Sequence, residues 1–373
     1  MKFIRFYNLS VFFLLTVINA AAQGHYNVMG TVADEKGQLL TSATVFISGS
    51  EKITMTNERG EFIFHNLDPG AFQLSVTMVG FAPDIRSLVI QTSSPNLKVV
   101  LKSRAIELNE VKIPPGNTLE DYYQLFKAQF LGISPNGLQS EIMNRDVIKL
   151  NYDKKKGLLT ASADEFLVIQ NKRLGYKVRY LLRGFSYNAI TNTAIYDGDS
   201  NFEELDGTQK MKKEWAKNRL QTYNGSFMHY LRSVYLNTVS KEGFITNQLY
   251  SAVSDRNDPG SLDRIAIDPR PLKYDTLATI IDTSFISLKA PNFYLTYNRK
   301  KANAKPKKTP KNNRVNTELD YNGSIIRMPF KEAIVDRKGS YTDYRAFYIH
   351  GNMARRRLGD QLPFEYQPPV TQH

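Results

Sequence analysis

The chain has 373 residues, with 49 lysines and arginines against 36 aspartates and glutamates, and its formal net charge at pH 7 is +13. It contains no cysteine, which excludes disulfide bonds, thiol catalysis and thiolate metal sites. The length predicts two domains, and the 42% of hydrophobic residues can supply two cores.

The first 22 residues have the pattern of a secretory signal peptide. Two basic residues precede an apolar run at 6–18 and three alanines at 20–22. A membrane anchor is the alternative, but it needs about 18 apolar residues, and this run is shorter and contains Asn8. We therefore expect a mature protein that begins at Gln23, with no transmembrane helix after cleavage.

Residues 26–103 alternate apolar and polar positions in short runs, which is the period that a strand needs to bury one face. Turn residues separate the runs at 35–38, 57–60 and 68–70. Short strands at this spacing predict a two-sheet β-sandwich, small enough that we expect it to dock on the following chain. The apolar rows are Val28/Gly30/Val32, Val45/Ile47, Phe62/Phe64, Phe72/Leu74/Val76/Met78, Leu88/Ile90 and Val99/Leu101.

Several motifs in this stretch resemble the carboxypeptidase regulatory-like domain. They are Gly30-Thr31-Val32, Thr56-Asn57-Glu58-Arg59-Gly60-Glu61-Phe62, Leu67-x-Pro69-Gly70, Val79-Gly80-Phe81 and Val99-x-Leu101. The resemblance implies a transthyretin-like (prealbumin-like) sandwich of the kind common in envelope proteins of Bacteroidetes-type bacteria. In carboxypeptidases this domain accompanies the catalytic domain and carries no zinc ligand, so the resemblance implies a fold and a compartment but no chemistry.

Residues 104–117 are expected to form a linker, because Pro114-Pro115-Gly116 interrupts both helices and central strands. Within it, Leu108-x-Glu110-Val111 resembles the segment that follows this sandwich in TonB-dependent outer-membrane receptors. The 256 residues from Thr118 onward are too few for the membrane domain of such a receptor. An accessory component of a TonB-dependent uptake system stays as an alternative.

Residues 118–373 are expected to form a larger α+β domain with an antiparallel sheet. A helix follows Thr118, a suitable N-cap, with Glu120 and Asp121 in its first turn. Strand patterns follow at 142–150, 157–163, 165–170, 176–184 and 187–196, and residues 153–157 resemble a hairpin loop. The fold class is therefore β-rich α+β.

Residues 208–240 form a helical block that we expect to break at Asn224-Gly225-Ser226, with a second helix that ends near Gly243. Its second part, and Leu362-Pro363-Phe364-Glu365-Tyr366 near the chain end, resemble segments of uncharacterised Bacteroidetes envelope proteins, which implies a family but no activity. His229 could act as a base or ligand. No carboxylate stands at a triad or ligand spacing in its local sequence, so a structural histidine is favoured. Trp215 is interpreted as a core residue rather than a sugar platform.

The last third is expected to contain strands at 277–288, 292–298, 314–328 and 345–350. Residues 299–314 form a basic stretch without acids, in which Pro306 and Pro310 predict a loop without helix. This candidate anion-binding loop carries Arg299, Lys300, Lys301, Lys305, Lys307, Lys308, Lys311 and Arg314. Anionic lipid headgroups or an envelope glycan are its expected partners, and export argues against nucleic acid. A solvated hairpin loop is the simpler interpretation.

No zinc-protease, serine-hydrolase or phosphate-loop motif occurs in the chain. Three carboxylate pairs could support glycosidase chemistry, so a hydrolase of envelope glycan or peptide stays as an alternative. They are Asp164/Glu165, Asp197/Asp199 and Glu203/Glu204. We expect an exported, non-catalytic envelope protein without a cofactor, in the periplasm or at the outer membrane, with a binding or scaffolding role.

Overall fold

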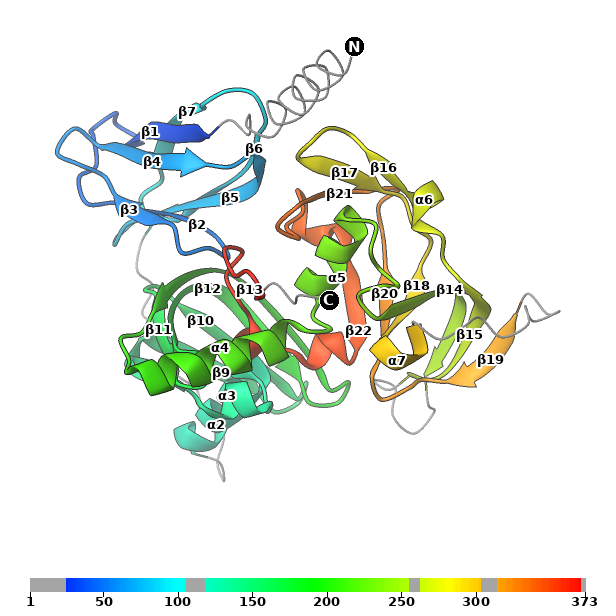
Figure 1. Ribbon diagram of the computed structural model, residues 1–373. Helices are drawn as coiled ribbons and strands as arrows, with labels where there is room; N and C mark the ends of the chain where they lie inside the picture. Colours follow the sequence, from blue (N-terminus) through cyan, green and yellow to red (C-terminus); the bar gives the residue numbers. More distant parts are fainter. Residues whose placement is uncertain (1–24, 105–117, 255–261, 303–313, 370–373) are drawn as a thin grey trace, which may run out of the picture.

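The computed structural model describes residues 25–104, 118–254, 262–302 and 314–369. The signal peptide expected at residues 1–22 lies outside these ranges, and so does the expected linker apart from Arg104. Antiparallel sheets dominate the described residues, and a β-sandwich stands at the N-terminal end (Figure 1). The predicted β-rich α+β class is confirmed.

Residues 26–101 form the predicted sandwich. One sheet has the order β4 (Glu61–Leu67), β1 (Tyr26–Asp34) and β7 (Asn96–Leu101), and the other has the order β3 (Ile53–Met55), β2 (Thr44–Ile47), β5 (Gly70–Thr77) and β6 (Asp84–Ile90). Strands β1 and β7 are parallel, and the other pairs are antiparallel. The alternating residues predicted to point inward, such as Val32, Val45, Leu74 and Leu101, are buried in one core.

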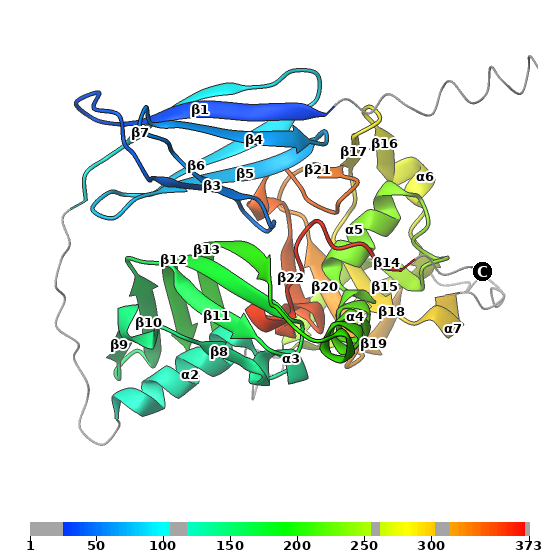
Figure 2. The same cartoon turned by 60° about the vertical axis from the view of Figure 1, so that its left-hand side comes forward.

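The next sheet belongs to residues 118–223, here called the first half of the larger part. Its strands are β8 (Ser140–Ile142), β11 (Leu167–Asn171), β12 (Tyr176–Asn188), β10 (Leu158–Ala163) and β9 (Ile148–Asp153) in spatial order, and β13 (Thr193–Glu204) also pairs with β12. Helix α2 (Leu119–Leu131) covers the face away from the sandwich (Figure 2), and α3 (Pro135–Leu138) follows it. Phe126 and Phe130 of α2 pack edge-on against Phe185.

The predicted start of α2 is confirmed. The Thr118 hydroxyl accepts a hydrogen bond from the Asp121 N–H at 3.2 Å, and the Asp121 carboxylate accepts one from the Thr118 N–H at 2.8 Å. Such a capping box satisfies two backbone donors that a helix otherwise leaves free. The hairpin loop predicted at 153–157 is also confirmed, because it joins the antiparallel strands β9 and β10.

Two strand predictions are wrong in this half. The single strand expected at 142–150 is divided into β8, a 3-10 turn η2 (Arg145–Val147) and β9. The strand expected at 176–184 continues to Asn188 as β12, and the strand expected at 187–196 is the end of β12, a turn at 189–192 and the start of β13. A register shift between Leu182 and Gly184 breaks the alternation there, so that the pattern suggested a strand end where the structure has a bulge.

Helices α4 (Gln209–Tyr223) and α5 (Phe227–Tyr235) confirm the predicted break at 224–226. Gly225 has φ +70°, and the Ser226 hydroxyl accepts a hydrogen bond from the His229 N–H at 3.1 Å, which caps α5. The helix ends at Tyr235 and not near Gly243, since Asn237 with φ +53° turns the chain away.

Residues 227–353, here called the second half, hold two further sheets around a separate core. The larger has the order β19 (Val315–Glu318), β15 (Leu262–Pro271), β14 (Phe244–Ser254), β18 (Phe293–Tyr297), β20 (Gly323–Arg327) and β22 (Tyr348–Gly351), and the smaller has β16 (Ala278–Ile280), β17 (Phe285–Leu288) and β21 (Ala333–Asp336). Short helices α6 (Tyr274–Leu277), α7 (Arg299–Ala302), η3 (Tyr344–Ala346), η4 (Met353–Arg355) and η5 (Leu358–Asp360) lie between or after the strands.

Sequence analysis missed β14, β15 and β21 and merged other elements. The strand expected at 277–288 is the end of α6 with the hairpin β16–β17, and the strand expected at 314–328 is β19 and β20. Residues 299–302 are helical, which contradicts a loop without helix over 299–314. The Asn298 side chain accepts a hydrogen bond from the Lys301 N–H at 3.0 Å and so caps this turn, and both prolines lie beyond it.

The sandwich docks on the larger part through the outer face of its four-stranded sheet, as expected (Figure 2). The N–H of Gly49 donates to the carbonyl of Ser200 at 2.7 Å, and the Ala71 N–H donates to the Asp336 carboxylate at 3.2 Å. The Phe46 ring is fully buried and meets Phe166 edge-on. The division of the chain into domains at residue 103 stays a prediction.

The chain end returns from the second half to the first. Leu358 and Leu362 are buried in the core of the first half, and residues 362–366, here called the C-terminal strap, pass beneath the sandwich. The Phe364 N–H donates to the carbonyl of Gly49 at 2.8 Å. None of the helices in the described residues is long and apolar enough to cross a membrane.

Candidate functional site

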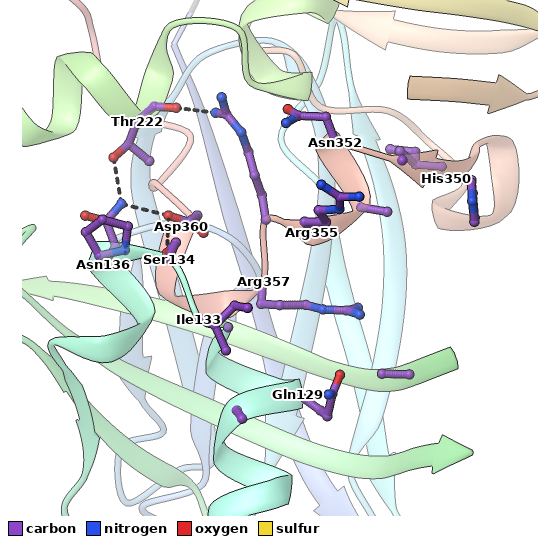
Figure 3. A pocket seen from close by; sticks show the side chains of 18 of the residues that line it. Gln129, Ile133, Ser134, Asn136, Thr222, His350, Asn352, Arg355, Arg357 and Asp360 are labelled. Atoms are coloured by element: carbon purple, nitrogen blue, oxygen red, sulfur yellow. Dashed lines mark hydrogen bonds between the residues drawn. The ribbon is translucent and has the colours of Figure 1, made fainter. Parts of the chain in front are cut away.

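A cleft of about 960 Å³ lies between the two halves of the larger part. Helices α2, α3 and α4 and the start of β13 form one wall, and β22, η4 and the turn before β20 form the other (Figure 3). Residues 354–360 cross between the walls. The volume is at the upper end of the range of about 300 to 1,000 Å³ that is typical of ligand sites.

Positive charge dominates this cleft. Arg173, Arg355, Arg356 and Arg357 line it, and Asp360 is the acid among its lining residues. In the described part of the chain, none of these four guanidinium groups forms an ion pair with a carboxylate. The Asp360 carboxylate instead accepts hydrogen bonds from the Ser134 hydroxyl at 2.9 Å and from the Asn136 amide at 2.8 Å (Figure 3).

Arg356 attaches the crossing segment 354–360 to the end of α4. Its guanidinium donates to the carbonyls of Thr222 at 2.6 Å and Asn224 at 3.3 Å, at the end of α4. Burial lowers the pKa of Arg356, and Asp360 partly opposes this effect. Because its donors are used inside the protein, Arg356 supplies charge to the cleft while it fixes the wall.

Arg355 and Arg357 are placed differently, since each lies beside a tyrosine. The Arg355 guanidinium lies over the ring of Tyr321, 4.7 Å from its centre, and Tyr321 is 74% exposed. Burial raises the pKa of Tyr196, and the hydrogen bond that Tyr196 shares with Arg357 opposes the rise. In Figure 3 the Arg357 side chain extends between those of Arg355 and Gln129.

His350 of β22 also lines the cleft. Burial lowers its pKa, and the charges of Arg327 and Arg355 lower it further. The ring is therefore neutral at pH 7 and can both donate and accept a hydrogen bond. Together with the arginines, this arrangement can bind an anionic group, whereas it offers no pairing of a nucleophile with a base.

The basic loop predicted at 299–314 is placed only in part. Lys305, Lys307, Lys308 and Lys311 lie outside the described residues. Arg299 is 3.6 Å from the carboxylate of Glu242, and Arg314 donates to the Ser251 hydroxyl at 3.2 Å. Arg299, Lys300, Lys301 and Arg314 do not line the cleft.

His229 is buried, as expected, with an exposure of 3%. One ring nitrogen accepts a hydrogen bond from the Gly225 N–H at 3.1 Å, and the other lies 3.2 Å from the Glu242 carboxylate. Local sequence missed this carboxylate because the chain turns back after α5. Burial lowers the pKa of His229 to about 4 although Glu242 opposes the shift, so the histidine is a neutral core residue.

Trp215 is 5% exposed, which confirms its interpretation as a core residue. Its indole N–H donates to the carbonyl of Lys172 at 3.0 Å, and its ring lies against Gly175 and Gly207, where any Cβ would collide with it. It is therefore not available as a sugar platform.

Five of the six carboxylates considered for glycosidase chemistry form ion pairs. Lys149 and Arg104 contact Asp164, and Arg183 contacts both Asp197 and Asp199. Arg179 lies 2.6 Å from Glu203, and Arg219 contacts Glu204.

Sequence analysis missed the cleft residues. The run Arg355-Arg356-Arg357 is visible in the sequence and was the available signal. The placement of these arginines depends on Tyr196 and Tyr321, which lie far from them in the sequence.

Comparison with solved structures gives weak likenesses. A streptococcal ancillary pilin is 15% identical over 21% of this chain and 30% of its own, with a TM-score of 0.18. A Pseudomonas aeruginosa protein proposed to bind carbohydrate is 14% identical over 22% of this chain and 92% of its own, with a TM-score of 0.17. The major pilin subunit of Bacillus cereus is 10% identical over 80% of this chain and 96% of its own, with a TM-score of 0.19. We draw no conclusion from TM-scores this low.

No curated protein matches the chain. The family described as CarboxypepD_reg-like domain matches residues 28–113, which include all strands of the sandwich except the first two residues of β1. The chain therefore contains a CarboxypepD_reg-like domain at its N-terminal end.

Proposed function

We propose that this protein is exported to the cell envelope and acts there by binding, with an anionic ligand in the arginine-lined cleft. One observation carries the proposal: four guanidinium groups line a single cleft, and within the described residues none of them is neutralised by an ion pair. Arg173, Arg356 and Arg357 are half-buried, and a half-buried charge without a counter-ion is costly. Arg355 is exposed, and an anionic ligand would bring negative charge to all four.

A binding role agrees with the CarboxypepD_reg-like domain at the N-terminal end, because in the carboxypeptidases that it resembles this domain carries no zinc ligand. The hydrolase alternative receives no support from the carboxylate pairs, which are held by arginines and lysines. Export, and a location in the periplasm or at the outer membrane, rest on the pattern of residues 1–22 and on the domain type.

The test is cosedimentation of residues 23–373 with lipopolysaccharide and with vesicles of phosphatidylglycerol or phosphatidylcholine. The variant Arg355→Glu/Arg357→Glu should lose binding to the anionic material. The control Lys210→Glu/Lys217→Glu makes the same charge change at two exposed positions of α4. It should bind within about twofold of the wild type, since screened surface charges contribute little. Equal binding by both variants would refute the role of the cleft.

The basic loop at 299–314 is a second candidate anion site. Charge reversal of Lys305, Lys307, Lys308 and Lys311 in the same assay separates the two candidates. If only this variant loses binding, the ligand binds at the loop and not in the cleft.

A further inference from the structure

The way in which Arg355 and Arg357 are held indicates what kind of group they recognise. The Arg355 guanidinium lies over the Tyr321 ring, 4.7 Å from its centre, and within the described residues its N–H groups donate to no protein acceptor. Arg357 lies beside Tyr196, and its side chain extends between those of Arg355 and Gln129 (Figure 3). A fixed guanidinium presents two parallel donors, the geometry that matches the two oxygens of a carboxylate or a phosphate.

The walls of the cleft carry polar groups that a simple anion does not need. The side-chain amides of Gln129, Gln221 and Asn352 line it and, within the described residues, make no hydrogen bond. An amide donates and accepts at once, which matches hydroxyl groups, whereas a phosphate or carboxylate only accepts. The three amides come from both walls, so that they face a ligand from two sides.

We infer that the cleft binds an acidic oligosaccharide, whose carboxylate or phosphate groups are held by Arg355 and Arg357 and whose hydroxyls bond to the wall amides. This rests on the proposed anion-binding function and adds the ligand class. The volume of about 960 Å³ accommodates several sugar units rather than one ring. Tyr321 and Tyr196 are positioning residues, because they act through the arginines.

The test is isothermal titration of residues 23–373 at 150 mM NaCl with four ligands. Hexagalacturonate carries carboxylates and hydroxyls, a phosphomannan oligosaccharide carries phosphates and hydroxyls, maltohexaose carries hydroxyls alone, and linear polyphosphate carries charge alone. At least one acidic saccharide should bind, and maltohexaose should bind at least about 100-fold more weakly. The acidic saccharide that binds more tightly identifies the charged group.

Variants test the two parts of the recognition separately. Arg355→Lys keeps the charge but loses the paired donors, and we expect a loss of about tenfold for the acidic saccharide. Tyr321→Ala should weaken binding about fivefold, and Tyr321→Phe, which keeps the ring, should restore it. Gln129→Leu should weaken saccharide binding about fivefold and leave polyphosphate binding unchanged.

Two results would overturn the inference, and they are distinguishable. If polyphosphate binds in an Arg355-dependent manner while no saccharide does, the ligand class is wrong and anion binding stands. If no ligand of the four binds, both the ligand class and the proposed function fail. If Gln129→Leu weakens the binding of the acidic saccharide and of polyphosphate equally, the amides have no role in recognising hydroxyl groups.

Discussion

Replacement of Arg232 by alanine should detach the C-terminal strap. Arg232 of α5 is 6% exposed, and its guanidinium donates to three carbonyls: Lys338 at 2.9 Å, Tyr366 at 2.8 Å and Phe364 at 3.1 Å. Each buried carbonyl left without a donor costs about 1–3 kcal/mol, and loss of a member of a buried charged network costs about 3–5 kcal/mol in total. We expect the free energy of opening the strap to fall by about 3–5 kcal/mol in the variant.

The loss should be local to the strap, and hydrogen–deuterium exchange measures it. A destabilisation of 3 kcal/mol corresponds to exchange that is about 100-fold faster at the amides of Phe364 and Tyr366, which are hydrogen-bonded in the wild type. The control is Arg86→Ala, since Arg86 pairs with Asp84 on the partly exposed edge strand β6 and should contribute at most about 1 kcal/mol. Unchanged exchange in the strap of the Arg232→Ala variant would refute the reasoning.

Three further predictions follow from single residues. Gly49→Ala should lower the free energy of unfolding by about 1–3 kcal/mol more than the control Gly37→Ala, as measured by urea unfolding. Both glycines have positive φ, but only at Gly49 would a Cβ meet the Phe364 ring, at 2.5 Å. Equal losses in the two variants would contradict this contact. Burial lowers the pKa of His229 to about 4, so the unfolded chain binds more protons than the folded chain between pH 6.5 and 4. The free energy of unfolding should therefore fall by up to about 3 kcal/mol as the pH drops through that window. His229→Gln should flatten this part of the plot of unfolding free energy against pH, and an unaltered plot would show that another group is responsible. The pKa of His350 lies below its usual value, and the ring is neutral at pH 7. Protonation at lower pH adds positive charge to the cleft, so the affinity for hexagalacturonate should rise from pH 7 to pH 5 in the wild type but not in His350→Gln. The same rise in the variant would exclude His350 as the cause.

The sandwich could be predicted because its strands are regular and its turns carry glycine and proline at the positions that need them. The strands β14 and β15 could not be, since register shifts at Leu249 break the period of two on which a strand prediction depends. Pro269 and Pro271 within β15 also argue locally against a strand. The strand end wrongly predicted at 184 within β12 has the same cause, the register shift at Leu182.

The candidate site was harder to predict than the fold. Sequence analysis chose the basic stretch at 299–314 because its charge is concentrated along the chain. The cleft gathers fewer charges from three separate regions, around Arg173, His350 and Arg355–Arg357. Whether a charge is neutralised depends on tertiary neighbours, as the contact between His229 and Glu242 also shows.

The most direct test of the cleft as the binding site is arginine modification with phenylglyoxal, followed by mass spectrometry of residues 23–373 with and without the bound acidic saccharide. The account predicts that ligand protects Arg355 and Arg357 at least about tenfold, while Arg59, an exposed arginine of the sandwich, reacts at the same rate in both samples. Protection of Arg299 and Arg314 with no change at Arg355 and Arg357 would contradict it.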